Sequence, residues 1–69
     1  MERITMDIDG MSCGHCVRSV DGALKVLAGV TVEQVTVGQA TVSFDPAATT
    51  TDRIAQAIAD EGYSVRATR

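Results

Sequence analysis

Two cysteines separated by two residues are the part of this sequence that could carry chemistry. Cys13 and Cys16 lie within Gly10–Cys16, which reads GMSCGHC. Two thiolates this close together can point at one ion, and a soft pair at low coordination number suits Cu(I). A structural zinc site normally takes four ligands, whereas the chain has only one histidine besides this pair. The spacing therefore favours Cu(I) and argues against a closed zinc site.

The elements on either side of this segment would hold the two sulfurs at a loop and a helix start. Arg3–Asp9 alternates apolar and polar residues, which predicts a half-buried strand. From Cys16 the apolar residues recur at the spacing of one helical face up to about Ala28, where Gly29 is expected to close the helix. The positive end of that helix favours the thiolate form. A metal held on such an exposed loop is open to attack by a partner's thiols, which suits transfer better than storage.

Two strands are predicted after the first helix. Val30–Val37 and Ala40–Asp45 are expected to pair antiparallel, joined by a type II′ turn at residues 38–39. The apolar phase slips between Val32 and Val35, which predicts either a bulge in the first of these strands or a strand that begins late.

A second helix and a final strand complete the pattern. Thr50 or Thr51 can cap a helix that runs to Glu61, where Gly62 ends it. The last strand is predicted from the alternation of its apolar residues Tyr63, Val65 and Ala67. The βαββαβ order predicts an α+β, ferredoxin-like fold, in which a four-stranded antiparallel sheet carries both helices on one face and the third strand lies between the first two. Residues 1–69 are expected to form this single domain.

Length and composition exclude several classes of function. The chain has 69 residues, which leaves little room for a deep substrate pocket, and we expect no enzyme activity. A net charge of −3, with one tyrosine and one phenylalanine as the aromatic residues, argues against a nucleic-acid partner. No apolar run has the length of a signal peptide or a membrane-spanning helix. We expect a free-standing, cytoplasmic monomer whose acidic residues are solvated, among them Asp7, Asp9, Asp21 and Glu33.

The motif GMSCGHC between a first strand and a first helix resembles the metal-binding motif of the heavy-metal-associated domain family, in particular its bacterial copper chaperones. The resemblance covers essentially the whole chain and includes the turn Glu61–Tyr63, which in that family approaches the metal loop. It implies Cu(I) bound by Cys13 and Cys16 and delivered by thiolate exchange to the similar domain of a copper-transporting P-type ATPase. Ser12 is in keeping with copper, because zinc-exporting relatives often have an acidic residue at this position.

Three other side chains, two within the motif and one outside it, are assigned weaker roles. Met11 could offer a thioether to Cu(I), but a flexible apolar side chain before a loop more often packs in the core, and this is our expectation. His15 is adjacent to Cys16, so the two do not share a helical face and direct ligation by the imidazole is disfavoured. His15 is either simply solvent-facing or tunes the site, because a protonated imidazole would stabilise thiolate and make metal affinity depend on pH between about 5 and 8. Tyr63 is either a core aromatic or places its hydroxyl near the thiolates, as a hydrogen-bond donor or a shield.

Two other functions stay open from the sequence. The same domain could be the metal-binding regulatory part of a heavy-metal transporter that handles zinc, mercury or copper. The C-x-x-C pair also occurs in thiol-disulfide redox proteins, although 69 residues are too few for a thioredoxin-like fold. The sequence likewise leaves open a homodimer in which metal bridges two copies through four thiolates.

Overall fold

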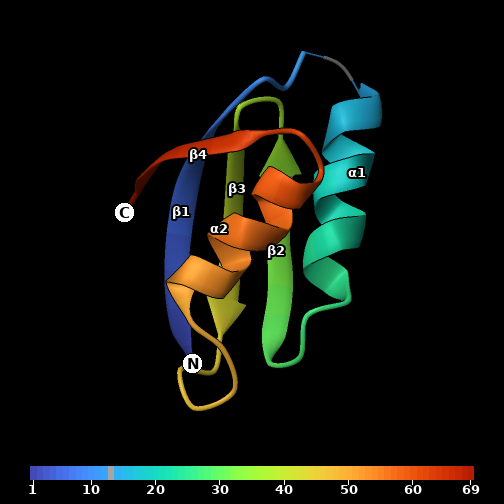
Figure 1. The fold of residues 1–69 in the computed structure, drawn as a ribbon. Helices are drawn as coiled ribbons and strands as arrows, with labels where there is room; N and C mark the ends of the chain where they lie inside the picture. The colour runs from blue at the N-terminus through green and yellow to red at the C-terminus, as the bar shows by residue number, and fades with distance from the viewer. Residues whose placement is uncertain (13) are drawn as a thin grey trace.

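Six elements follow the predicted order along the chain. The computed structural model describes residues 1–12 and 14–69. It contains β1 (Glu2–Asp9), α1 (Gly14–Lys25), β2 (Val30–Thr36), β3 (Gln39–Phe44), α2 (Thr51–Asp60) and β4 (Ser64–Thr68). The strands form one antiparallel sheet in the order β2-β3-β1-β4. Figure 1 shows both helices on the same face of this sheet, which confirms the predicted ferredoxin-like α+β class.

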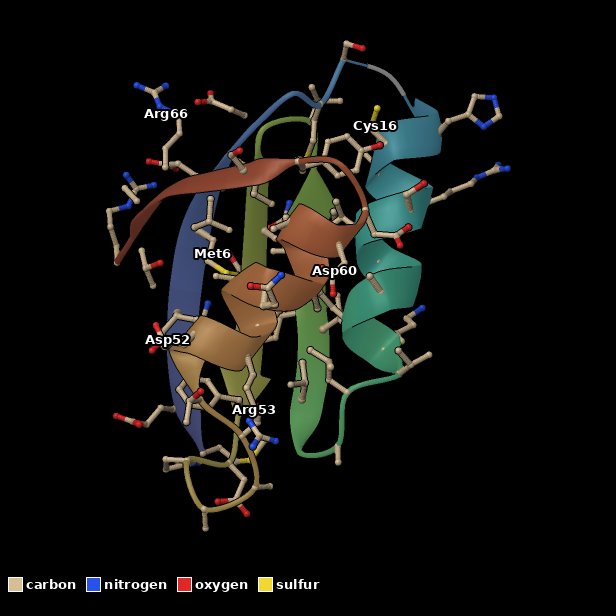
Figure 2. All side chains as sticks on the ribbon, in the orientation of Figure 1. Met6, Cys16, Asp52, Arg53, Asp60 and Arg66 are labelled. Carbon is tan, nitrogen blue, oxygen red and sulfur yellow. The ribbon has the colours of Figure 1, made fainter. Side chains whose placement is uncertain are left out.

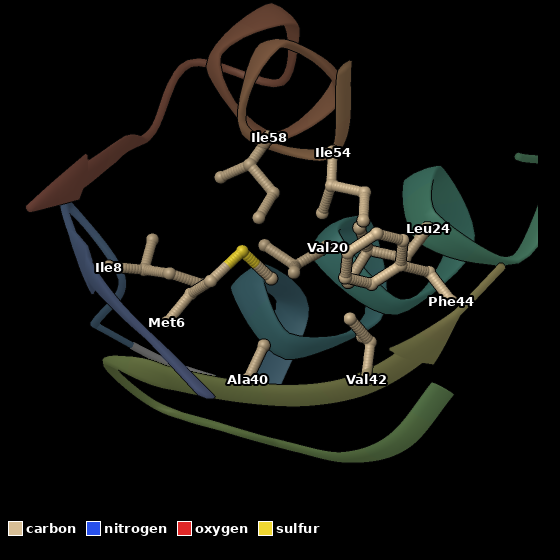
Figure 3. Close-up of a cluster of buried hydrophobic side chains, with 9 residues drawn as sticks. All are labelled: Met6, Ile8, Val20, Leu24, Ala40, Val42, Phe44, Ile54 and Ile58. Carbon is tan, nitrogen blue, oxygen red and sulfur yellow. The ribbon is translucent and has the colours of Figure 1, made fainter. Parts of the chain in front are cut away.

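Hydrophobic side chains from the sheet and the helices form one core between the two layers. Even-numbered residues of β1 face the helices, because successive side chains of a strand point to opposite faces. Each helix contributes two residues four positions apart, a spacing that places both on one helical face. Figure 3 shows the nine buried side chains of this core: Met6, Ile8, Val20, Leu24, Ala40, Val42, Phe44, Ile54 and Ile58.

α2 begins at the predicted cap. Thr50 has an extended backbone, and its Oγ1 accepts a hydrogen bond from the Arg53 amide at 3.2 Å. This bond satisfies one of the amides that a helix start leaves without an intrahelical partner. The helix ends at Asp60, with Glu61 as its C-cap. In the described part of the chain, no helix has the length and apolar character needed to cross a membrane.

α1 is shorter than predicted. It ends at Lys25, three residues before the expected end, and Val26 directly after it is 82% exposed. Leu27 still packs against the core, but from a turn. The spacing of Leu27 from the apolar residues of α1 suggested a longer helix. A residue in this turn reaches the same side of the core as a residue in a further helical turn would. Gly29 belongs to this turn, at a position where a Cβ atom would be 2.6 Å from the Cβ of Ala48.

The β2–β3 hairpin has the predicted bulge but a different turn. The register shifts between Val32 and Gln34, which makes Glu33 the extra residue of β2. The turn is formed by Val37 and Gly38, one residue earlier than expected. Gly38 has a φ of 86°, and no described residue other than glycine has a positive φ. The turn is therefore not type II′, which needs a positive φ at its first central residue.

β4 contains a second bulge, which the sequence analysis did not predict. Ile8 pairs with Val65 and Asp7 pairs with Ala67, so Arg66 is an extra residue on β4. Residues directly opposite each other on antiparallel strands point to the same side of the sheet. Ala67 therefore lies with Asp7 on the face that carries no helix, and it is exposed. The predicted apolar alternation of this strand is wrong at Ala67.

Ion pairs join the edge strands to β1 on the face of the sheet that carries no helix. Each of the four acidic residues expected to be solvated has a basic partner at 3.4 Å or less. Three pairs lie on the sheet and the fourth on α1: Arg3–Glu33, Arg66–Asp9, Arg69–Asp7 and Lys25–Asp21. These pairs are accessible to water, so each contributes little to the free energy of unfolding.

Candidate metal site

α1 places Cys16 in its first turn, where the helix meets the segment Gly10–Cys16, here called the CxxC loop. Val20 and Leu24, four and eight residues further along α1, are buried in the core. Cys16 shares their helical face and is half-buried, because it lies at the end of this apolar stripe. Figure 2 shows its sulfur at the end of α1 that adjoins the loop. The helix thus holds this thiol at the boundary between core and solvent.

The start of α1 is a favourable environment for a thiolate. Its first turn contains no acidic residue, and neither does the CxxC loop. The amide groups at a helix start carry a partial positive charge, and here no nearby carboxylate of the same segment offsets it. A negatively charged sulfur on Cys16 is stabilised by this arrangement.

Cys13 lies outside the described residues, so its role as the second ligand stays a prediction. Over residues 1–12 and 14–69, no group of three or more histidine, cysteine, aspartate or glutamate side chains could hold a metal ion.

Tyr63 lies beside the start of the CxxC loop, as the resemblance implies for the turn Glu61–Tyr63. β1 and β4 are paired up to Asp9 and Ser64, so the residue after Asp9 and the residue before Ser64 are brought together. A Cβ atom on Gly10 would be only 3.3 Å from Cδ1 of Tyr63. Tyr63 is half-buried and packs against the core. Its ring therefore contacts both the core and the loop, whereas an effect of its hydroxyl on the thiolates stays a prediction.

Met11 and Ser12 lie on different sides of the loop. Met11 is half-buried and packs against the core, which confirms the expected packing role. Ser12 is exposed. Met11 thus anchors the loop to the domain, while the residue directly before Cys13 is accessible to solvent.

His15 faces solvent together with Arg18. Both residues, with Gly14, line an open hollow on the surface of α1. Positions three apart share a helical face, whereas adjacent positions are about 100° apart around the axis. The imidazole and the Cys16 sulfur therefore start from different sides of the first turn. The tuning role of His15 stays a prediction.

Two features of the site were missed by the sequence analysis. The first is the close contact of Gly10 with Tyr63, for which a glycine directly after a strand was the available signal. The second is the ion pair between Asp9 and Arg66, in which Nε and Oδ2 are 3.4 Å apart. No local pattern indicates this pair, since it depends on the bulge that makes Arg66 an extra residue.

Comparisons with known proteins match almost the whole chain. Residues 5–64 match the family model described as the heavy-metal-associated domain. The copper chaperone CopZ of Bacillus subtilis is 42% identical over 67 residues, which cover 94% of this chain and 97% of that protein. A solved copper-binding domain from HMA7, a P-type ATPase, has a TM-score of 0.90 and 32% identity, covering 100% of this chain and 99% of that chain. A solved CopZ metallochaperone has a TM-score of 0.83 and 35% identity, and the match covers 93% of this chain and 98% of that chain. The predicted family and fold are confirmed.

Proposed function

This chain belongs to the heavy-metal-associated domain family, and on that premise we propose that it is a copper chaperone. It binds one Cu(I) ion between the thiolates of Cys13 and Cys16 and passes the ion to the metal-binding domain of a copper-transporting P-type ATPase. The family is one of metal-binding carriers rather than enzymes. We place the protein in the cytoplasm, as a single domain that is monomeric without metal.

The position of Cys16 is the observation that carries this proposal. Its sulfur lies in the first turn of a 12-residue helix, half-buried and in a segment without acidic residues. A thiolate there is stabilised by the helix start, and a second cysteine three positions earlier can supply the other bond. Two sulfur ligands at low coordination number are the donor set that suits Cu(I).

Exposure around the motif supports transfer rather than storage. Ser12, Gly14 and His15 are all exposed, so a thiolate from a partner can approach the loop through solvent. The incoming thiolate forms a third sulfur–copper bond, after which one of the two original bonds breaks, and copper stays monovalent throughout. Repetition of this exchange moves the ion, and each 1.4 kcal/mol of difference in affinity shifts the equilibrium about tenfold.

The exchange of thiolate ligands also indicates what kind of partner accepts the ion. An acceptor needs a pair of accessible thiolates, and a domain of the same fold could present them in a matching geometry. The similarity to a copper-binding domain of a P-type ATPase supports such a domain as the acceptor.

The same similarity favours one alternative, in which this chain is the regulatory metal-binding domain of a transporter. The intact mass of the native protein, measured after affinity capture from its source cells, separates the two functions. A chaperone gives a mass close to 7.2 kDa, whereas a transporter gives a far larger one.

Anaerobic titration tests the metal assignment. Reduced protein is titrated with Cu(I) against a chromophoric Cu(I) chelator, and separately with zinc. We expect one Cu(I) per chain, binding more tightly than zinc, and a loss of at least about a hundredfold in Cu(I) affinity for Cys13→Ser and Cys16→Ser. Tighter binding of zinc would reverse the choice of metal, and unchanged affinity in both serine variants would remove the site.

Met11→Leu is the matched control in the same titration. It removes the thioether but keeps nearly the same volume, so the packing of the loop against the core is retained. The Cu(I) affinity should match that of the wild type. A loss as large as that of the cysteine variants would make Met11 a ligand. The reduction of insulin is measured in parallel. We expect no catalytic turnover, whereas turnover would identify the chain as a thiol-disulfide redox protein.

A further inference from the structure

β4 is held to the domain with little help from apolar burial. Of its five residues only Val65 is half-buried, and the other four are exposed. The strand lies at the edge of the sheet, so it forms backbone hydrogen bonds with β1 alone. Segments with few buried apolar contacts and solvent-accessible hydrogen bonds are those that open locally at low cost.

Two ion pairs instead tie β4 and the residue after it to β1. Arg66 contacts Asp9 with 3.4 Å between Nε and Oδ2, and the two side chains are 67% and 58% exposed. Arg69 donates to both carboxylate oxygens of Asp7, at 3.1 and 2.9 Å. Arg69 also exchanges two backbone hydrogen bonds with Thr5. Exposed pairs of this kind are screened by salt, so this attachment depends on ionic strength.

The attachment is directly linked to the CxxC loop. Asp9 is the last residue of β1 and pairs with Ser64, the first residue of β4. The residue after Asp9 is Gly10, and the residue before Ser64 is Tyr63, whose Cδ1 would be 3.3 Å from a Cβ atom on Gly10. Whatever keeps Asp9 against β4 therefore also keeps Tyr63 against the loop.

We propose that the ion pairs Asp9–Arg66 and Asp7–Arg69 form a salt-sensitive clamp that positions Tyr63 against the CxxC loop. When the clamp opens, β4 and Tyr63 move away from the loop together. The consequence for copper, which rests on the proposed function, is that opening removes the Tyr63 ring from beside the loop and so widens the approach of a thiolate that the exposed residues Ser12, Gly14 and His15 already allow. Asp9 and Arg66 are thus positioning residues that act through Tyr63.

The clamp can be tested without metal, because Tyr63 is the only tyrosine and the chain has no tryptophan. Intrinsic fluorescence therefore reports on Tyr63 alone, and hydrogen exchange of those β4 amides that bond to β1 reports on opening of β4. In Asp9→Asn we expect these amides to exchange about two- to fivefold faster, with a changed tyrosine emission. Adding salt to the wild type should change both signals in the same direction.

Glu33→Gln is the matched control. It removes the same charge from the opposite edge strand, where Glu33 pairs with Arg3, and it should leave both signals at their wild-type values. The double variant Asp9→Arg with Arg66→Asp restores an ion pair of reversed polarity, and it should recover slow exchange. The clamp is disproved if Asp9→Asn behaves as the wild type, or if the control changes the signals equally.

Copper-loaded protein gives the last measurement. The rate at which dithiothreitol removes Cu(I) should rise in Asp9→Asn by about the same factor as β4 exchange, and remain unchanged in Glu33→Gln. An unchanged rate in Asp9→Asn, with faster exchange of β4, would keep the clamp but disprove its control of copper release. If no copper binds, the proposed function fails, while the metal-free measurements still decide whether the clamp exists.

Discussion

Gly10 shows how one residue constrains the CxxC loop. Its φ of 95° lies in a region that residues with a Cβ atom rarely adopt, and a Cβ atom there would be 3.3 Å from the Tyr63 ring, which is closer than such contacts usually are. The glycine therefore serves two needs at once, the direction in which the chain leaves β1 and the close approach of the ring.

Replacing Gly10 by alanine should destabilise the protein by about 1–3 kcal/mol, because the new side chain is strained and displaces Tyr63. Urea unfolding followed by circular dichroism measures the change. Gly22→Ala is the control, since a Cβ at that helical position would have no atom of another element within 4 Å and alanine there should add up to about 1 kcal/mol. A Gly10→Ala protein as stable as the wild type would contradict the strain argument.

The residues of the site divide into those that local spacing predicts and those that only the fold brings together. Cys13 and Cys16 are predicted as ligands from their spacing, and Met11 was expected to pack against the core because its side chain is apolar and flexible, as the structure shows. The contact of Tyr63 with Gly10 required a register between two strands at opposite ends of the sequence. Spacing carries no information about that register.

Among the elements, α2 depends on its cap. Thr50 accepts the amide hydrogen bond of Arg53 at 3.2 Å, so Thr50→Ala should lower the free energy of unfolding by about 1 kcal/mol. Thr51→Ala is the matched control, because Thr51 is exposed and already within the helix. Urea unfolding of both variants checks the prediction, and equal losses in the two would show that the hydroxyl of Thr50 is not the cause.

The two bulges show which irregularities a sequence reveals. In β2, Val32 and Val35 lie on either side of Glu33 and are out of phase, so the change of phase was visible and a bulge was one of the two structures predicted from it. In β4 the strand has only five residues, and alanine is compatible with either face, so the extra residue Arg66 left no such trace. The predicted end of α1 was wrong for a related reason. Leu27 packs against the core from a turn, so its position in the apolar pattern suggested that the helix continued.

At the scale of the whole molecule, nine apolar residues in the described part of the chain are buried in one core. Domains of this size are marginally stable, so binding of a ligand to the folded state alone should have a measurable effect. Metal binding would be coupled to stability here, because the proposed ligands come from the loop and helix that the core positions.

Copper(I) should therefore raise the free energy of unfolding. At a free copper concentration about a hundred times the Kd, the expected gain is about 2.7 kcal/mol, and removal of the ion with a chelator should reverse it. Thermal unfolding of loaded and chelator-treated protein under anaerobic conditions measures the shift. Cys16→Ser should show none, and an equal shift in that variant would mean that copper stabilises the fold from elsewhere.

The bulges at Glu33 and Arg66 also affect how two copies can meet. Each bulge places a charged side chain in an edge strand, and that side chain forms an ion pair with a residue of β1. Neither edge of the sheet therefore offers the flat, uninterrupted strand that strand addition needs. The addition of strands from other copies, as in a fibril, is therefore disfavoured at both edges of the sheet. Under the proposed function, the contact that matters is made at the end of the domain that carries Cys16, where a partner's thiolate can take over the ion.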